Sequence, residues 1–267
     1  MISTDEESVA ILDFGAQYTQ LIARRVRECG VYCEIEPYTR SVDEIQRKAP
    51  RGVILSGGPR SVYEPGAPAV DPALFTIGIP VLGICYGHQL MARTLGGVVA
   101  EAAEHEYGPA SIEVLDQDEL LKDAHTGDQC WMSHGDTVLK APPGFRVLAR
   151  TRTTPVAVMA DTARHLYGVQ FHPEVAHTTF GKGLLRRFAL DICGCKGLWS
   201  PGSFVDRTIP EIRKLVGNAG VVCGVSGGVD SCTVAELVHR AIGDRLTCVF
   251  VDHGLLRLGE KEQVETK

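Results

Sequence analysis

A cysteine between two glycines, directly after a short apolar run, is the feature that most restricts how this chain can fold. The run 79–82 (Ile-Pro-Val-Leu) leads into residues 83–87 (Gly-Ile-Cys-Tyr-Gly), and Leu90, Met91 and Leu95 follow at helical spacing. This order predicts a strand, a sharp turn and a helix, with the thiol at the turn. The flanking glycines allow a strained bend that presents the thiol at the mouth of a cleft. The start of the helix offers free N–H groups and a positive dipole end, which activate a thiol and stabilise an oxyanion.

The alternative interpretation of Cys85 is a small buried core residue, which is the usual state of a free cysteine. A second motif favours catalysis. The apolar run 166–171 predicts a buried strand, and it leads into His172, Pro173 and Glu174. A thiol nucleophile needs a base, and the base needs a group that orients it. Cys85, His172 and Glu174 are therefore predicted to meet at one sheet edge as nucleophile, general base and orienting carboxylate.

Short apolar runs alternate with amphipathic segments in the first part of the chain. Strands are predicted at 9–12, 31–35 and 52–55, and helices at 18–28 and 42–48. This alternation predicts an α/β fold built on a doubly wound, mostly parallel sheet with helices on both faces. In such sheets, ligands bind at the carboxyl ends of the strands.

The pattern changes between residues 98 and 161. Strands are predicted at 112–115, 147–149 and 156–159, with few helical stretches between them. An antiparallel extension beside the parallel core explains this change. A helix at 178–191 is expected to close the first domain.

The motifs around Cys85 and His172 resemble those of class I glutamine amidotransferases, whose glutaminase triad is Cys, His and Glu in this order. Three further runs, 11–18, 55–59 and 131–136, resemble the amidotransferase half of the GMP synthetase family. The resemblance implies a flavodoxin-like fold and release of ammonia from glutamine by the triad described above.

The resemblance also implies roles for residues around the triad. Main-chain N–H groups of Gly58 and Tyr86 would form the oxyanion hole, although the run 56–59 is alternatively a plain Gly-Pro turn. Gln89 lies one helical turn past the nucleophile and would contact glutamine. His105 stands where an arginine is common in the family, which removes the basis for an ionic role there. The other implied glutamine-binding residues are Ser133, His134 and Asp136.

A stretch rich in Gly, Ser and Pro at 196–203 predicts a linker. The domain boundary is therefore expected near residue 199, with an amidotransferase domain at 7–199 and a second domain at 200–267. A chain of 267 residues is long enough for one large domain and part of another.

The second domain is predicted to start with a helix at 210–216 and a strand at 220–225. Residues 226–231 (Ser-Gly-Gly-Val-Asp-Ser) then form a turn into a helix at 234–242. Successive N–H groups at such a turn create a concavity for phosphate. The run lacks the Gly-Lys ending of a Walker loop and resembles the pyrophosphate loop of the ATP pyrophosphatase family. The alternative is a Gly-Gly turn capped by Asp230 or Ser231. The implied ATP-binding residues are Ser226, Gly227, Gly228, Val229, Asp230, Ser231 and Cys232.

A further strand is predicted at 246–252, the run 251–257 again resembles the GMP synthetase family, and a helix is expected from Glu260. Two strands are too few for a doubly wound nucleotide-binding domain. The second domain is therefore expected to be a truncated α/β nucleotide-binding domain.

Composition limits the partners. The formal net charge of −6 gives no reason to expect nucleic acid, and the sequence shows neither a membrane-spanning run nor a signal peptide, which favours the cytoplasm and no membrane. Nine cysteines, an odd number, suggest reduced thiols. Cys193 and Cys195 lack a second ligand pair, so no metal site is expected.

For the complete protein, the resemblance implies glutamine, ATP and xanthosine monophosphate (XMP) as substrates. ATP with Mg2+, for which Asp230 would be an indirect partner, activates XMP, and ammonia from the glutaminase converts it to GMP. Glutamine hydrolysis itself needs no cofactor. A homodimer is also implied. Two alternatives stay open: an amidotransferase that serves another acceptor, and a glutamine-sensing module without turnover. The intact triad argues against the second.

Overall fold

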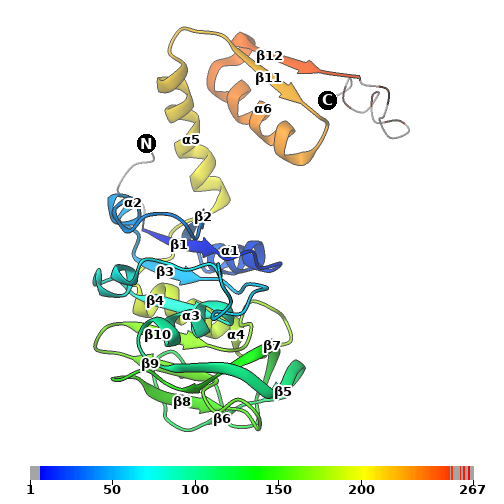
Figure 1. Ribbon diagram of the computed structural model, residues 1–267. Coiled ribbons are helices and arrows are strands. Elements are labelled where there is room, and N and C mark those ends of the chain that lie inside the picture. Colours follow the sequence, from blue (N-terminus) through cyan, green and yellow to red (C-terminus); the bar gives the residue numbers. More distant parts are fainter. Residues whose placement is uncertain (1–6, 253, 255–258, 260, 262–263, 265–267) are drawn as a thin grey trace. The chain divides into compact units, whose positions relative to one another are not determined.

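The computed structural model describes residues 7–252, 254, 259, 261 and 264. Its internal contacts divide the chain into two units, Met1–Leu198 and Trp199–Lys267. The division lies beside residue 199, where the sequence predicts a boundary. Each unit is described by itself (Figure 1).

An eight-stranded mixed sheet forms the centre of the first unit, in the order β2-β1-β3-β4-β10-β9-β8-β6. The five strands from β2 to β10 are parallel, and the remaining three continue the sheet in antiparallel pairing. The predicted doubly wound, mostly parallel sheet is thereby confirmed. The strand bounds are β1 (Ser8–Asp13), β2 (Tyr32–Pro37), β3 (Gly52–Leu55), β4 (Val81–Ile84), β6 (Glu113–Val114), β8 (Arg146–Arg150), β9 (Val158–Asp161) and β10 (Leu166–Val169).

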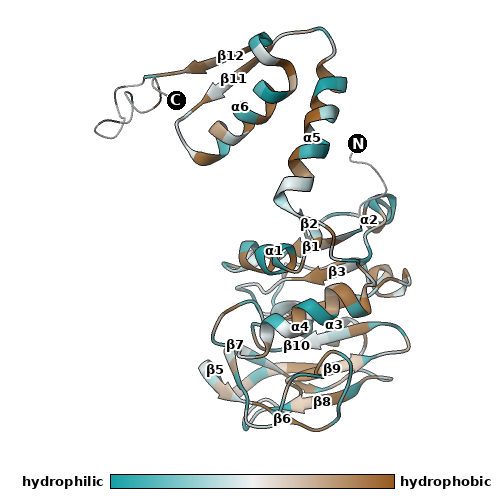
Figure 2. Ribbon diagram, turned by 180° about the vertical axis from the view of Figure 1, so that it is seen from behind, coloured by the Kyte–Doolittle hydropathy of each residue, from teal (hydrophilic) through white to brown (hydrophobic). Residues whose placement is uncertain are grey.

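Helices cover both faces of this sheet because its strands are apolar on both sides. In β1, Val9 and Ile11 pack into one core cluster with Ile22, whereas Leu12 packs into a second cluster with Met91. Ile22 belongs to a helix on one face and Met91 to a helix on the other. The helix bounds are α1 (Thr19–Glu28), α2 (Val42–Lys48), α3 (Tyr86–Thr94) and α4 (Gly181–Arg187), with a 3-10 turn at Pro72–Thr76. In Figure 2, strand β3 carries apolar colour, whereas α1 and α2 are coloured largely polar.

The antiparallel region forms two pieces. Strands β6, β8 and β9 extend the main sheet, while β5 (Val98–Ser111) and β7 (Gln129–Lys140) form a separate two-stranded ribbon. The pairing of this ribbon is irregular between Glu101 and Glu106. The antiparallel extension expected from the sequence is therefore confirmed for β6, β8 and β9, whereas β5 and β7 pair with each other and satisfy their main-chain groups outside the main sheet.

The helix expected at 178–191 begins later, at Gly181, and continues past Arg187 as a π-helical turn over Phe188–Ile192. The Thr178 hydroxyl donates a 2.6 Å hydrogen bond to the His172 carbonyl and accepts one of 3.0 Å from the Trp131 N–H. Thr178 therefore stabilises the loop before α4 and is not part of the helix.

The second unit contains α5 (Pro201–Val216), β11 (Val221–Val225), α6 (Val229–Ile242) and β12 (Leu246–Phe250), and its two strands pair in parallel. Helix α6 begins earlier than the predicted residue 234, and β12 ends before the predicted residue 252. Most of the run 251–257 and the start of the helix expected from Glu260 lie outside the described residues.

The prediction of a linker through residue 203 and of a helix starting only at residue 210 is wrong. Helix α5 already begins at Pro201, and Pro210 lies within it. The Ser200 hydroxyl accepts a 3.1 Å hydrogen bond from the Ser203 N–H. Serine before the first turn and proline at its first position are both signals of a helix start.

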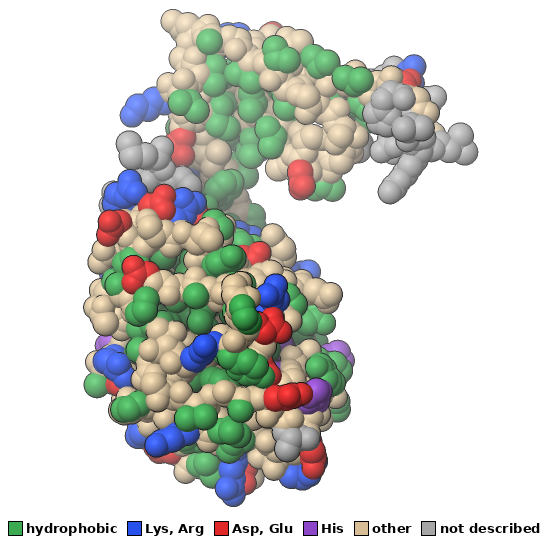
Figure 3. Space-filling model, viewed as in Figure 1, with side chains coloured by type: hydrophobic (Ala, Val, Ile, Leu, Met, Phe, Trp, Pro, Cys, Tyr) green, Lys and Arg blue, Asp and Glu red, His purple; other side chains and the backbone are tan. Residues whose placement is uncertain are grey.

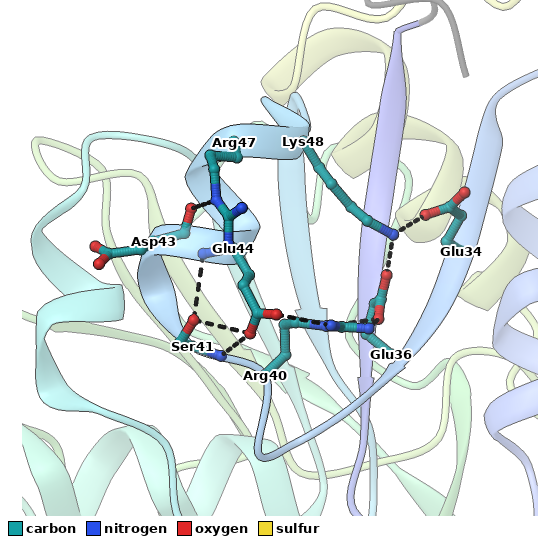
Figure 4. A network of polar contacts seen from close by, with 8 residues as sticks. All are labelled: Glu34, Glu36, Arg40, Ser41, Asp43, Glu44, Arg47 and Lys48. Carbon is teal, nitrogen blue, oxygen red and sulfur yellow. Dashed lines mark hydrogen bonds and ion pairs between the residues drawn. The ribbon is translucent and has the colours of Figure 1, made fainter. Parts of the chain in front are cut away.

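A network of charged side chains joins β2, at one edge of the main sheet, to α2 (Figure 4). The Glu36 side chain is only 7% exposed and pairs with both Arg40 and Lys48. Burial raises the pKa of Glu36, but the hydrogen bonds from Lys48 and Arg40 outweigh it, so this pKa lies below its usual value. The Ser41 hydroxyl caps α2 and forms a reciprocal capping box with Glu44.

The surface of the first unit carries acidic and basic side chains interspersed on the face seen in Figure 3. Within the described residues, no helix is long and apolar enough to span a membrane. All nine cysteines fall within this described part, and each is a free thiol.

Candidate active site

The Cys85 turn lies between β4 and α3 and has a strained main chain. Its φ and ψ are 51° and −105°, a combination that non-glycine residues rarely adopt. A Cβ atom at Gly83 would lie 2.5 Å from the Gly87 carbonyl oxygen, and one at Gly87 would lie 2.5 Å from the Leu55 carbonyl oxygen. Both flanking glycines are therefore required, and they hold the thiol at the carboxyl end of the central strand.

His172 reaches Cys85 because β10 is the neighbour of β4 in the sheet. The Cys85 N–H donates a 2.8 Å hydrogen bond to the Val169 carbonyl, which places the end of β10 beside the thiol. On the far side of the imidazole, His172 Nδ1 lies 2.7 Å from Glu174 Oε1. The three residues form a line in the order sulfur, imidazole, carboxylate.

This arrangement favours a positively charged imidazole. Burial lowers the pKa of His172, but the hydrogen bonds to Cys85 and Glu174 outweigh burial and hold that pKa well above its usual value. An imidazolium beside a thiol stabilises the thiolate, which is the nucleophilic form.

Neighbouring side chains hold the base and its carboxylate in place. Thr178 bonds the His172 carbonyl, and Arg25 Nε donates a 3.0 Å hydrogen bond to the Glu174 carbonyl. The Tyr18 ring contacts the His172 ring edge-on at 5.7 Å between centroids. The motif 172–174 is therefore held from α1 and from the loop that precedes α4.

The loop after β3 packs against the triad. A Cβ atom at Gly57 would lie 3.3 Å from His172 Cε1, and one at Gly58 would lie 3.2 Å from Tyr86 Cγ. The Tyr86 hydroxyl donates a 2.6 Å hydrogen bond to the Pro68 carbonyl, which directs this side chain away from the thiol. The structure thus brings Gly57 against Cys85 and Gly58 against Tyr86, so both residues predicted for the oxyanion hole lie at the turn that carries the thiol.

Of the residues predicted to bind glutamine, Gln89 and Ser133 lie close to the nucleophile. The Ser133 carbonyl oxygen is 3.7 Å from Cys85 Sγ, and Gln89 Nε2 donates a 2.8 Å hydrogen bond to the Asp136 carbonyl. The side chains of His134 and Asp136 have other partners. The Asp136 carboxylate accepts hydrogen bonds from Ser61 and Tyr63, and the buried His134 ring faces Glu106.

Gln170 and Thr178 are residues beside the triad that the sequence reasoning missed, and Glu106 is a missed partner of His134. Gln170 Nε2 lies 3.9 Å from Cys85 Sγ, and Gln170 Oε1 accepts a 3.3 Å hydrogen bond from Gln89. The sequence does indicate a role for Gln170, because an amide within the apolar run 166–171 is unusual unless the amide has a hydrogen-bond partner. The His105 Nε2 atom lies 3.7 Å from a Glu101 carboxylate oxygen at the surface.

In the second unit, residues 226–228 and the first turn of α6 form a compact strand-to-helix turn. The Ser231 hydroxyl accepts a 3.1 Å hydrogen bond from the Ser226 N–H, and Gly227 has a φ of 77°. Beside this turn lies a cavity of about 480 Å³, lined in part by Gly227, Gly228, Val229 and Cys232. Asp230 and Ser231 fall in the first turn of α6, and not in the preceding turn as expected.

Comparison with known families agrees with this geometry. The family model for glutamine amidotransferase class-I matches residues 10–192, which contain the whole triad. The family model for NAD synthase matches residues 205–255 in the second unit.

The chain also resembles curated proteins over most of its length. It is 58% identical over 259 residues to a protein of Parafrankia sp. (strain EAN1pec) named GMP synthase [glutamine-hydrolyzing], covering 97% of this chain and 48% of that protein. It is 52% identical over 257 residues to the protein of that name from Clostridium perfringens, covering 96% of this chain and 50% of the relative. The chain therefore spans about half the length of these relatives.

Among solved structures, a candidate GMP synthase component from Thermoplasma acidophilum superposes with a TM-score of 0.64 at 29% identity, over 71% of this chain and 94% of that one. A glutamine amidotransferase from Thermotoga maritima superposes with a TM-score of 0.55 at 20% identity, over 70% of this chain and 98% of that one, which supports the fold alone. With a family model that matches residues 10–192 and a Cys-His-Glu line at the carboxyl edge of its sheet, the chain belongs to the class-I glutamine amidotransferase family.

Proposed function

We propose that the first unit hydrolyses the side-chain amide of glutamine to glutamate and ammonia. One observation carries this proposal: His172 lies between the Cys85 thiol and Glu174, with its pKa held well above the usual value by both neighbours after the opposing effect of burial. A thiol, a base and an orienting carboxylate in this order are the requirements of acyl transfer through a thioester.

His172 first takes the proton of the Cys85 thiol, and the thiolate sulfur bonds to the carboxamide carbon. The carbonyl electron pair moves onto oxygen, and the N–H groups of Gly58 and Tyr86 stabilise the resulting negative charge by donating hydrogen bonds to it. As the tetrahedral intermediate collapses, the C–N bond breaks and His172 donates its proton to the departing ammonia. His172 then takes a proton from water, whose oxygen attacks the γ-glutamyl thioester, and glutamate leaves as the thiol is restored.

The amino acid end of glutamine is proposed to lie along β7. The Ser133 main chain is next to the sulfur, and Gln89 ties the Asp136 main chain to the first turns of α3. Because the side chains of His134 and Asp136 are engaged elsewhere, their contribution to substrate binding would come from the main chain.

For the longer protein to which the relatives point, we propose that the ammonia aminates XMP to GMP at the expense of ATP, with Mg2+ as cofactor, in a cytoplasmic homodimer. The support is the name of the curated relatives and the match of the second unit to the NAD synthase model. The N–H groups and two serine hydroxyls of the loop 226–231 suit a pyrophosphate group, and Asp230 is an indirect candidate partner for Mg2+. Domain limits of 7–199 for the glutaminase and 200–267 for the start of the ATP-binding part belong to the same proposal.

Labelling of the thiol tests the glutaminase. The purified chain is treated with a diazoketone analogue of glutamine, with and without free glutamine, and each cysteine peptide is quantified by mass spectrometry. Labelling confined to Cys85 and prevented by glutamine is the expected result. Labelling spread over the nine cysteines, or labelling of Cys85 that glutamine does not reduce, would contradict the proposal.

A further inference from the structure

Glu106 carries a negative charge at a largely buried position, where a charge costs free energy. It lies in β5 directly opposite His134 in β7, and its side chain is 14% exposed. Its carboxylate oxygens lie 3.4 Å from His134 Nε2, 3.0 Å from the Thr151 hydroxyl and 2.5 Å from the Thr154 hydroxyl. Burial raises the pKa of Glu106, but these hydrogen bonds, that of His134 first, bring it down to about 2. The carboxylate is therefore ionised throughout the neutral range.

His134, the partner of the Glu106 carboxylate, has contacts at both of its ring nitrogens. His134 Nδ1 lies 2.8 Å from the Asp136 carbonyl oxygen, while Nε2 faces Glu106. A carbonyl oxygen only accepts, so Nδ1 carries the hydrogen of that bond. Because the side chain of His134 is 2% exposed, water cannot replace Glu106 at Nε2 without opening the core.

The stretch of β7 around this ring also borders the thiol. The Asp136 carbonyl that receives His134 Nδ1 also receives Gln89 Nε2, and the Ser133 carbonyl lies 3.7 Å from Cys85 Sγ. A shift of the imidazole would thus act on the main chain of residues 133–136, which borders the site. Glu106 itself is remote from the reacting atoms and acts only through His134.

We infer that Glu106 is a positioning residue, which holds the His134 ring and through it the main chain of residues 133–136 in the conformation that binds the amino acid end of glutamine. The inference rests on the proposed glutaminase function. It predicts that Glu106 governs affinity for glutamine and leaves the reactivity of the thiol itself unchanged, since the main chains of Cys85, His172 and Glu174 are hydrogen-bonded to Val169, Trp131 and Arg25, which lie outside residues 133–136.

The test compares Glu106→Gln with Glu104→Gln in the whole chain. The first variant keeps shape but replaces one carboxylate oxygen by an amide NH2, which cannot accept a hydrogen bond. Glu104 lies on the same strand and pairs with Arg152 at the surface, with 63% of its side chain exposed, so it is a matched control. Two reagents are used at Cys85: the diazoketone analogue of glutamine, and methyl methanethiosulfonate, a small thiol reagent without an amino acid end.

For Glu106→Gln we expect labelling by the glutamine analogue to slow about tenfold, and the glutamine concentration needed for protection to rise about tenfold. The rate with methyl methanethiosulfonate should stay within about twofold of the parent rate, because thiol activation is intact. Glu104→Gln should match the parent with both reagents. A purely structural role for Glu106 would change both rates together.

Thr154→Val, which at nearly constant volume removes the hydroxyl that contacts both Glu106 and His134 Nε2, is made in parallel. If Glu106→Gln loses the far-UV circular dichroism of the parent, the selective loss must still be seen in Thr154→Val. The inference is overturned if the folded variants react with both reagents at parental rates or lose both rates equally. A parent chain that shows no glutamine-protected labelling instead refutes the glutaminase proposal, so the two failures are distinct.

Discussion

The main chains of Gly87 and Leu55 are in direct contact: a Cβ atom at Gly87 would lie 2.5 Å from the Leu55 carbonyl oxygen. The first turn of α3 therefore packs directly on the main chain of β3. This contact places the thiol and the start of α3 relative to the loop that carries Gly58.

Gly87→Ala is expected to displace α3 and to abolish glutamine-protected labelling of Cys85, with a loss of stability of about 2–3 kcal/mol from overpacking. Gly183→Ala in α4 is the control, because a Cβ atom there would meet only the Asp123 carboxylate at 3.5 Å. Chemical denaturation of both variants measures the effect. An unchanged Gly87→Ala variant would show that the contact does not constrain the helix.

Cys85→Ser should reduce glutamate release from glutamine by at least about 10³-fold while the fold persists, because a hydroxyl beside this base is a far weaker nucleophile than a thiolate. Cys248→Ser, which removes an exposed thiol in the second unit, should retain parental release. Release is measured by coupling glutamate to a dehydrogenase. Comparable rates for Cys85→Ser and the parent would remove Cys85 from the mechanism.

Glu174→Gln should lower the pKa of His172, because one of the two hydrogen-bonded groups that raise it loses its charge. The pH titration of the His172 ring, followed by NMR with 15N-labelled histidine, should move its midpoint to lower pH. Glutamate release should fall about 10- to 100-fold, since a positioned carboxylate orients the base. A midpoint equal to that of the parent would contradict the assignment of Glu174.

The stability of the fold should also depend on the protonation of His172. Since the pKa of His172 is raised in the folded state, its contribution is fully present below about pH 6.5, its unfolded value, and is lost as pH rises through the folded pKa. The denaturation midpoint of the parent should therefore decline on the alkaline side more steeply than that of Glu174→Gln. Parallel profiles of the two proteins would refute this linkage.

Glu36→Gln should destabilise the first unit by about 1–3 kcal/mol, because Arg40 and Lys48 lose their buried carboxylate partner. The folded pKa of Glu36 is lowered, so its contribution is present above its unfolded value of 4.5 and disappears as pH falls through the folded value. Urea denaturation should show that the difference in stability between the parent and Glu36→Gln is smaller below pH 4 than at neutral pH. Glu113→Gln, which breaks an exposed pair with Arg150, should leave the midpoint unchanged at both pH values.

The strands and the triad could be predicted because short apolar runs mark buried strands, and because two such runs end in chemically distinctive residues. The start of α5 could not be predicted from composition, since Ser200 and Pro201 serve a helix start as readily as a linker. The engagement of the His134 and Asp136 side chains could not be predicted, because their partners Glu106, Ser61 and Tyr63 are distant in sequence and no local pattern reports them. Glu106 was missed for the same reason: its burial arises from a partner strand distant in sequence.

The central position of β10 has a consequence for synthesis of the protein. The strand that carries the base inserts between β4 and β9, long after β4 has left the ribosome. Until residues 166–174 emerge, Cys85 belongs to a nascent chain with no imidazole to activate it and with β4 as an open edge. The reactive thiol is thus assembled only when the growing polypeptide closes its own sheet, and translation that stops earlier yields a fragment without the base.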